Sequence, residues 1–77
     1  MTPKQIKTLR AKLGISQDAL ARNLGVTTSA VSLWEQGRRR PRGPARRLLI
    51  LLERGDLSLA ALHRAARADE EATDAEA

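Results

Sequence analysis

The apolar residues of this chain recur at intervals of three and four residues, the spacing of one face of an α-helix. In the first segment Ile6, Leu9 and Leu13 form such a stripe, and the lysines between them can remain in water. Similar stripes follow several glycines, which are common residues at helix C-termini. The pattern predicts an all-α fold with five helices.

Residues that cap helix N-termini precede most of these stripes. Thr2, followed by Pro3 at the first helical position and Gln5 at the third, forms a capping-box sequence. We therefore expect the first helix to run from Pro3 to about Leu13. The expected N-caps of helices two, three and five are Ser16, Thr27 and Ser58.

The fourth predicted helix differs from the others because it is apolar nearly all round. We expect it to begin at Pro44, after a loop, and to run to about Arg54. Ile50 and Leu51 fall off its main stripe, so more than one side of this helix needs a cover. Either the fifth helix or another subunit would supply it.

The stretch from residue 16 to residue 37 predicts two short capped helices joined by a tight turn. Gly25 can adopt the positive φ that ends the first of them, and Ala21 is small enough for the two helices to cross closely. In the second of these helices, Val31 and Trp34 fall on one side, which we expect to pack in the core. This is the layout of a helix-turn-helix DNA reader.

The opposite side of that second helix is polar and rich in hydroxyl groups. It carries Thr28, Ser29, Ser32 and Gln36, with Leu33 at its edge. Short side chains let a helix enter a major groove deeply, hydroxyls can bond to base edges or phosphates, and a leucine can touch a thymine methyl. Alone, such a face would more often be ordinary solvated surface, but the capped turn beside it favours DNA recognition.

Composition limits the remaining possibilities. The 77 residues suffice for one small domain, and without cysteine there is no disulfide framework. The lone His63 cannot form a metal site or a nucleophile–base pair, so we expect no enzyme, no cofactor and no small-molecule substrate. No apolar run approaches the roughly 18 residues of a membrane span, and no signal-peptide segment is evident. We therefore expect a cytoplasmic protein that makes no membrane contact.

Charge is unevenly divided along the chain. Residues 1–68 hold all 14 Lys and Arg residues against 4 Asp and Glu residues, hence +10, whereas residues 69–77 hold 5 acidic residues, hence −5. We expect a DNA-binding domain over 1–68 and a disordered acidic tail over 69–77. Four arginines follow the hydroxyl-rich helix, where a phosphate backbone would pass; they are Arg38, Arg39, Arg40 and Arg42.

Several of these positions together resemble the Cro and phage-repressor family of helix-turn-helix regulators, over roughly residues 3–55. The matching motifs are Ser16–Gln17, Leu20–Ala21, Leu24–Val26, Val31–Ser32 and Trp34–Gly37. The resemblance implies a compact, lambda-repressor-like fold in which the helix after the turn reads the major groove of double-stranded DNA.

The resemblance also implies roles for individual residues. The expected base-reading residues are Thr28, Ser29, Ser32 and Leu33. The expected phosphate-binding residues are Gln17, Thr27 and Gln36, together with the four arginines of the loop. Arg10 is expected to pair with Glu35. Positions 28, 29 and 32 lack Arg, Gln and Asn, which form the strong bidentate contacts to bases. We therefore expect water-mediated contacts and DNA shape to contribute more to recognition.

The leading hypothesis is a dimeric repressor of its own promoter that binds a near-palindromic operator. Candidate contacts of a homodimer are Ile50, Leu51, Leu59 and Leu62, although the last two could instead close the core of one subunit. The alternative is an antitoxin that holds a toxin protein and represses its own operon, since Trp34–Arg39 and Gly43–Arg46 also resemble antitoxin DNA-binding domains. A non-specific nucleoid protein would not need the turn motif.

Overall fold

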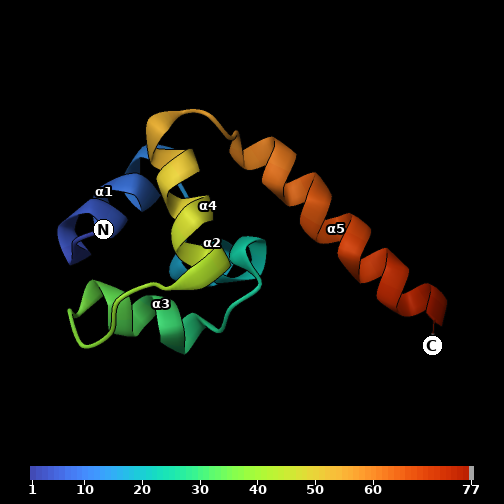
Figure 1. The fold of residues 1–77 in the computed structure, drawn as a ribbon, viewed down its shortest axis with the longest axis horizontal. Coiled ribbons are helices and arrows are strands. Elements are labelled where there is room, and N and C mark those ends of the chain that lie inside the picture. Colours follow the sequence, from blue (N-terminus) through green and yellow to red (C-terminus); the bar gives the residue numbers. More distant parts are fainter. Residues whose placement is uncertain (77) are drawn as a thin grey trace.

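The structure is a computed structural model that describes the backbone of residues 1–76 and the side chains of residues 1–70. Within the described chain it consists of helices and loops, so the predicted all-α fold is confirmed (Figure 1). The helices are α1 (Pro3–Leu13), α2 (Gln17–Leu24), α3 (Thr28–Glu35), α4 (Gly43–Arg54) and α5 (Leu59–Glu76).

The helix starts lie where the capping residues predict them. Thr2 and Gln5 exchange both hydrogen bonds of a capping box, at 2.8 and 3.2 Å. The hydroxyl oxygens of Ser16, Thr27 and Ser58 each accept from the backbone N–H three residues on, at 3.1 Å. Because these bonds join residues close in sequence, the helix starts are specified locally.

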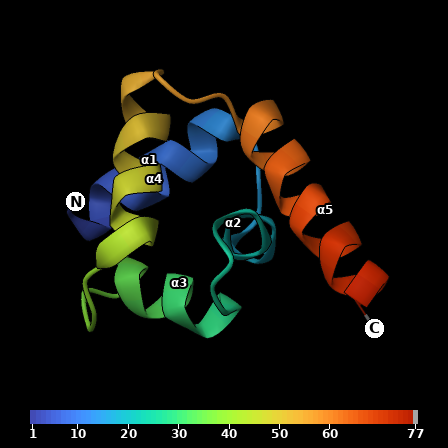
Figure 2. The ribbon, with the colours of Figure 1, turned by 45° about the vertical axis from the view of Figure 1, so that its right-hand side comes forward.

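One core joins all five helices. Its most deeply buried large side chains are Ile6 of α1, Leu20 of α2, Val31 of α3 and Leu49 of α4, each at most 1% exposed. Figure 2 shows α3 at the bottom of the molecule, below α1, α4 and α2, with α5 on the far side of α2; α3 contacts both α1 and α2. The buried side of α3 therefore points inward, and its other side faces away from α1.

The fourth helix begins at Gly43, one residue earlier than expected, because Gly43 itself takes the first helical position and Pro44 the second. Leu62 of α5 is only 7% exposed and belongs to the core, and α5 packs mainly against α2. Of the two roles that the sequence left open for Leu62, the single chain shows the packing in the core, and a contact with a second subunit stays a prediction. Leu51 stays 39% exposed, the one large apolar side chain so exposed among residues 1–70.

Helix α5 continues past the expected domain boundary at residue 68. Its backbone is helical to Glu76, and its last turns leave the rest of the molecule (Figure 1). The predicted disordered tail spans residues 69–77, and the side chains of 71–77 lie outside the described part of the chain. The disorder therefore stays a prediction. None of the described helices combines the length and apolarity that a bilayer crossing requires.

Candidate nucleic-acid interface

The turn between α2 and α3 has the backbone geometry that its sequence requires. Gly25 adopts φ 74° and ψ 30°, the left-handed conformation that glycine reaches without steric cost. The N–H of Val26 then donates to the carbonyl of Ala21 at 3.0 Å, which closes the end of α2. Ala21 itself is 1% exposed, so α2 and α3 approach closely at this point. The two helices form a helix-turn-helix unit.

Helix α3 has one buried and one accessible side. Val31, Trp34 and Glu35 are buried, and the tryptophan is a core residue as the sequence predicts. Thr28 and Ser29 are exposed, whereas Ser32 and Leu33 are half-buried at the border of the accessible side. The structure thus brings all four expected base-reading residues onto one helix, near its accessible side.

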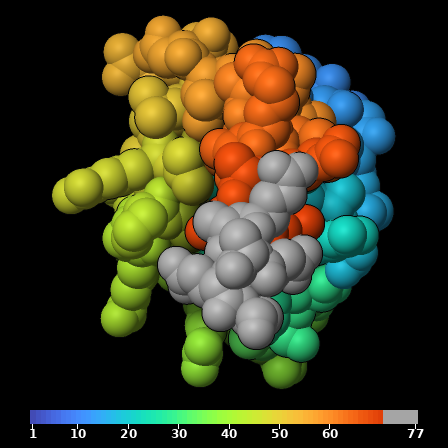
Figure 3. Space-filling view, turned by 90° about the vertical axis from the view of Figure 1, so that its right-hand side faces the viewer, coloured from blue at the N-terminus to red at the C-terminus, as the bar shows by residue number. Residues whose placement is uncertain are grey.

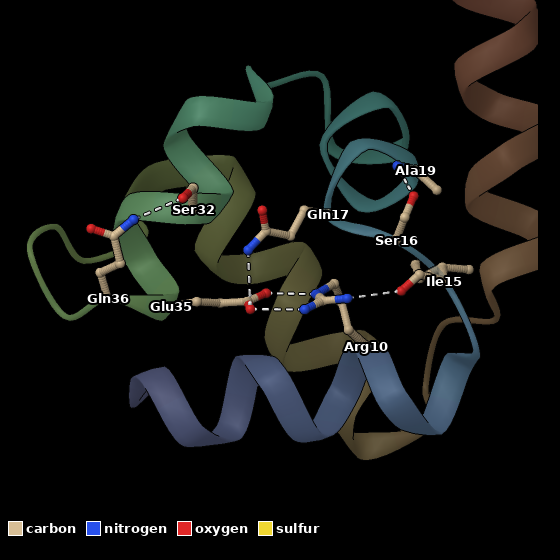
Figure 4. A network of polar contacts seen from close by, with 8 residues as sticks. All are labelled: Arg10, Ile15, Ser16, Gln17, Ala19, Ser32, Glu35 and Gln36. Carbon is tan, nitrogen blue, oxygen red and sulfur yellow. Dashed lines mark hydrogen bonds and ion pairs between the residues drawn. The ribbon is translucent and has the colours of Figure 1, made fainter.

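A partly buried ion pair fixes the C-terminal end of α3 against α1. The Arg10 guanidinium donates to both carboxylate oxygens of Glu35, from Nε at 2.6 Å and from Nη2 at 2.9 Å (Figure 4). Its Nη1 donates to the carbonyl of Ile15 at 3.1 Å, and Gln17 Nε2 donates to Glu35 at 3.2 Å. The network therefore connects α1, the start of α2 and the end of α3.

The same contacts favour the charged form of both partners. The hydrogen bond from Arg10 holds the pKa of the Glu35 carboxyl below its usual range, although burial opposes this shift; Gln17 adds to the lowering. The hydrogen bond to Glu35 raises the pKa of Arg10. Glu35 is consequently an ionised, fully partnered carboxylate inside the domain. Its role is to position the helices.

Two hydroxyls of the accessible side are bonded to neighbouring side chains. Gln36 Nε2 donates to Ser32 Oγ at 2.8 Å, one turn apart on α3 (Figure 4). Thr28 Oγ1 donates to the carboxylate of Asp18, in the first turn of α2, at 2.9 Å. Sequence analysis did not single out Asp18, because no periodicity relates residues ten positions apart on two different helices.

The expected phosphate-binding residues lie at the two ends of the motif. Gln17 and Thr27 lie near the starts of α2 and α3, where the Thr27 hydroxyl caps α3 and the Gln17 amide keeps one N–H free of Glu35. Gln36 and the arginines lie beyond the end of α3, and all of them are exposed. The structure therefore places Thr27 at the N-terminal end of α3, whereas Gln17, through its bond to Glu35, lies near the C-terminal end, where Gln36 and the arginines follow.

The loop between α3 and α4 forms a strongly basic surface next to α3. Its start is ordered by two backbone bonds, from Arg38 and Arg39 N–H to the carbonyl of Leu33 at 3.0 and 3.3 Å. Arg38, Arg39, Arg40 and Arg42 line a cleft of about 710 Å³ together with Ala30, Trp34 and Gly37. Long side chains of this region, in yellow-green, extend from one edge of the molecule (Figure 3). Polyanions are the ligands that such a surface attracts.

This basic surface adjoins another arginine, to which the sequence analysis assigned no role. Arg46, in the first turns of α4, lines a second cleft of about 410 Å³ with Arg39 and Arg40, beside the N-terminal residues of the chain. Its signal in the sequence was the continuation of the basic run beyond the loop. Within residues 1–70, no three His, Asp or Glu side chains gather as metal ligands would.

A helix-turn-helix unit with an accessible, hydroxyl-bearing second helix and an adjoining basic loop defines a DNA-binding domain. Comparison with protein families gives the same result: the helix-turn-helix family model matches residues 6–62. The chain belongs to this family, that of the Cro- and repressor-type regulators, and it is a DNA-binding transcriptional regulator. A search of curated proteins found no match to the chain.

Proposed function

We propose that this protein is a dimeric repressor that binds a near-palindromic operator, including one in its own promoter, by placing α3 in the major groove. The observation that carries the proposal is the accessible face of α3, whose short hydroxyl side chains lie between Thr27 at its start and the exposed Gln36 and arginines that follow its end. A groove about 12 Å wide accepts an α-helix, and small side chains let its backbone approach the base edges. Such a repressor acts in the cytoplasm, where the DNA is.

The dimer is proposed on the apolar surface of α4 and the start of α5. Leu51 is 39% exposed, and Ile50 and Leu59 are half-buried, so one chain leaves them incompletely covered. A twofold pair of subunits would present two α3 helices to one side of the duplex. The half-sites of its operator would then lie one helical turn, about 34 Å, apart.

The test is binding of the gene's own upstream DNA by the unmodified protein and by Ser29→Glu. The duplex is compared with a shuffled duplex of equal composition at two salt concentrations. A glutamate on the exposed face of α3 adds bulk and negative charge against the bases, so we expect specific binding to fall at least about tenfold. Circular dichroism and urea unfolding establish that the variant is folded.

Thr8→Glu is the matched control, because it adds the same charge at an exposed position of α1, on a surface that it shares with Glu53 of α4 and that contains none of the candidate DNA-binding residues. We expect its specific affinity to stay close to that of the unmodified chain. Retained specific binding by a folded Ser29→Glu variant would rule out docking through this face.

A second candidate is an antitoxin that also holds a protein partner. It is favoured by the C-terminal part of α5, which lies beyond the family match and whose last turns leave the globule (Figure 1). Co-expression with the product of the adjacent gene, followed by size-exclusion chromatography, tests it. A stable complex whose partner is a ribonuclease would favour this candidate, and separate elution would count against it.

A further inference from the structure

The hydrogen bond between Thr28 and Asp18 gives one hydroxyl of the α3 face a fixed polarity. Thr28 is the first residue of α3, Asp18 lies in the first turn of α2, and both side chains are exposed. We propose that Asp18 is a specificity-determining residue, which acts by making Thr28 a hydrogen-bond acceptor toward DNA. The inference rests on the proposed docking of α3 in the major groove.

The polarity follows from the chemistry of the two groups. A threonine hydroxyl has one proton and two lone pairs, and a carboxylate can only accept. Because the bond runs from Thr28 Oγ1 to Asp18 Oδ1 at 2.9 Å, the single proton of Thr28 points toward Asp18. What remains for other groups is the two lone pairs of Oγ1, which can only accept. Without Asp18 the same hydroxyl could turn and either donate or accept.

An acceptor at this place discriminates between bases in the major groove. Adenine and cytosine present amino groups there, at N6 and N4, whereas guanine and thymine present keto oxygens. Thr28 therefore favours an amino base on the strand that it faces. The Asp18 carboxylate strengthens this preference, since its negative charge repels a keto oxygen in the same place.

A neighbouring hydroxyl on the same side has the opposite arrangement. Ser32 Oγ accepts from Gln36 Nε2 at 2.8 Å, so the serine keeps its proton for a further bond. Ser29 makes no hydrogen bond through its hydroxyl to any residue that the structure describes. Of these three hydroxyls, then, only the one at Thr28 has its proton committed to a carboxylate.

The experiment is selection of bound duplexes from a library randomised across both half-sites, with the unmodified chain, Thr28→Val and Asp18→Ala. Thr28→Val keeps the side-chain shape and removes the hydroxyl, so the position at which this variant loses base preference is the one that Thr28 faces. We expect the unmodified chain to select adenine or cytosine there by about tenfold, as a single good base contact can give. Asp18→Ala should abolish the preference at this same position and leave the others unchanged.

Glu53→Ala is the control for charge, because it removes one exposed carboxylate from α4. Glu53→Ala should leave the base preference at every position intact. An effect of net charge alone would change the affinity for all sequences, and it would do so in Glu53→Ala and Asp18→Ala alike. Urea unfolding identifies any variant that fails to fold. If Asp18→Ala fails, the base selected at the position that Thr28→Val identifies still tests whether Thr28 acts as an acceptor.

Three results contradict the proposals, and they are distinguishable. If the unmodified chain enriches no sequence, the proposed operator recognition fails, and this inference fails with it. If a sequence is enriched but the position identified by Thr28→Val carries guanine or thymine, the acceptor role is wrong. If Asp18→Ala retains the full preference at that position, Asp18 has no part in specificity.

Discussion

At the scale of single residues, Glu35 is a charged side chain held inside the domain. It is 6% exposed, and its carboxylate accepts from Arg10 and Gln17, residues of two other helices. A buried charge is tolerated only when it is paired and hydrogen-bonded. The position of α3 relative to α1 and α2 therefore depends on this network.

Arg10→Met should destabilise the domain by about 3 kcal/mol at pH 7, because it leaves the Glu35 carboxylate buried without its countercharge. Urea unfolding measures the change. Arg54→Met is the matched control, since Arg54 pairs with Asp56 at 3.5 Å in water, with side chains 70% and 56% exposed. Exposed pairs contribute little, so we expect less than about 1 kcal/mol for the control. Equal losses in the two variants would contradict a structural role for the buried pair.

The stability difference between Arg10→Met and the unmodified chain should depend on pH. The folded-state pKa of Glu35 lies below the usual value of 4.5, so its stabilising effect is complete above that pH and is lost as pH falls through the lowered pKa. The difference should therefore shrink below pH 4.5. A constant difference down to pH 2.5 would show that lost packing, and not charge, explains the effect.

At the scale of elements, the helix starts and ends follow local chemistry, whereas the angle between α2 and α3 depends on one turn. Gly25 has φ 74°, and a Cβ built there would meet nothing within 4 Å. Gly55, after α4, has φ 79° and equally open surroundings. The cost of an alanine at either site therefore comes from the backbone conformation alone.

Gly25→Ala and Gly55→Ala should each lower the free energy of unfolding by about 1 kcal/mol, the cost of placing a Cβ in the left-handed region. Urea unfolding of both variants checks this. If the turn relaxes to avoid the strain, DNA binding should weaken in Gly25→Ala and not in Gly55→Ala. A much larger stability loss in Gly25→Ala than in Gly55→Ala would mean that the cost at Gly25 does not come from its backbone conformation alone.

At the scale of the whole molecule, charge is arranged around the α3 face. The basic loop adjoins the end of α3, and its arginines are exposed. Binding to DNA releases condensed counterions in proportion to the phosphates neutralised, so the loop should contribute to the salt dependence of affinity for any sequence. Base selectivity, by contrast, should depend on the side chains of α3.

Replacing Arg39 and Arg40 together by alanine should weaken binding to specific and shuffled duplexes alike. The slope of log K against log salt should become shallower by about 1.8, which is about 0.9 for each lost phosphate contact. The double replacement of Arg64 and Arg67 on α5 removes equal charge elsewhere and should leave the slope unchanged. An unaltered slope in the loop variant would exclude the loop from phosphate binding.

The sequence by itself determined the local features of this protein. The capping residues, the glycine turn and the spacing of apolar residues act within a few positions of one another, so the five helices and the core positions of Val31 and Trp34 were predictable. The family resemblance added the pairing of Arg10 with Glu35, which lie 25 positions apart and which spacing alone does not connect.

Only the tertiary structure decided which distant groups meet. It placed Leu62 in the core, although its apolar spacing suited a subunit interface equally well, because burial depends on where α5 packs. It also brought Asp18 to Thr28, through the angle at which α2 and α3 cross. Contacts between helices depend on how their faces pack, and a pattern read along one helix carries no information about the side chain opposite.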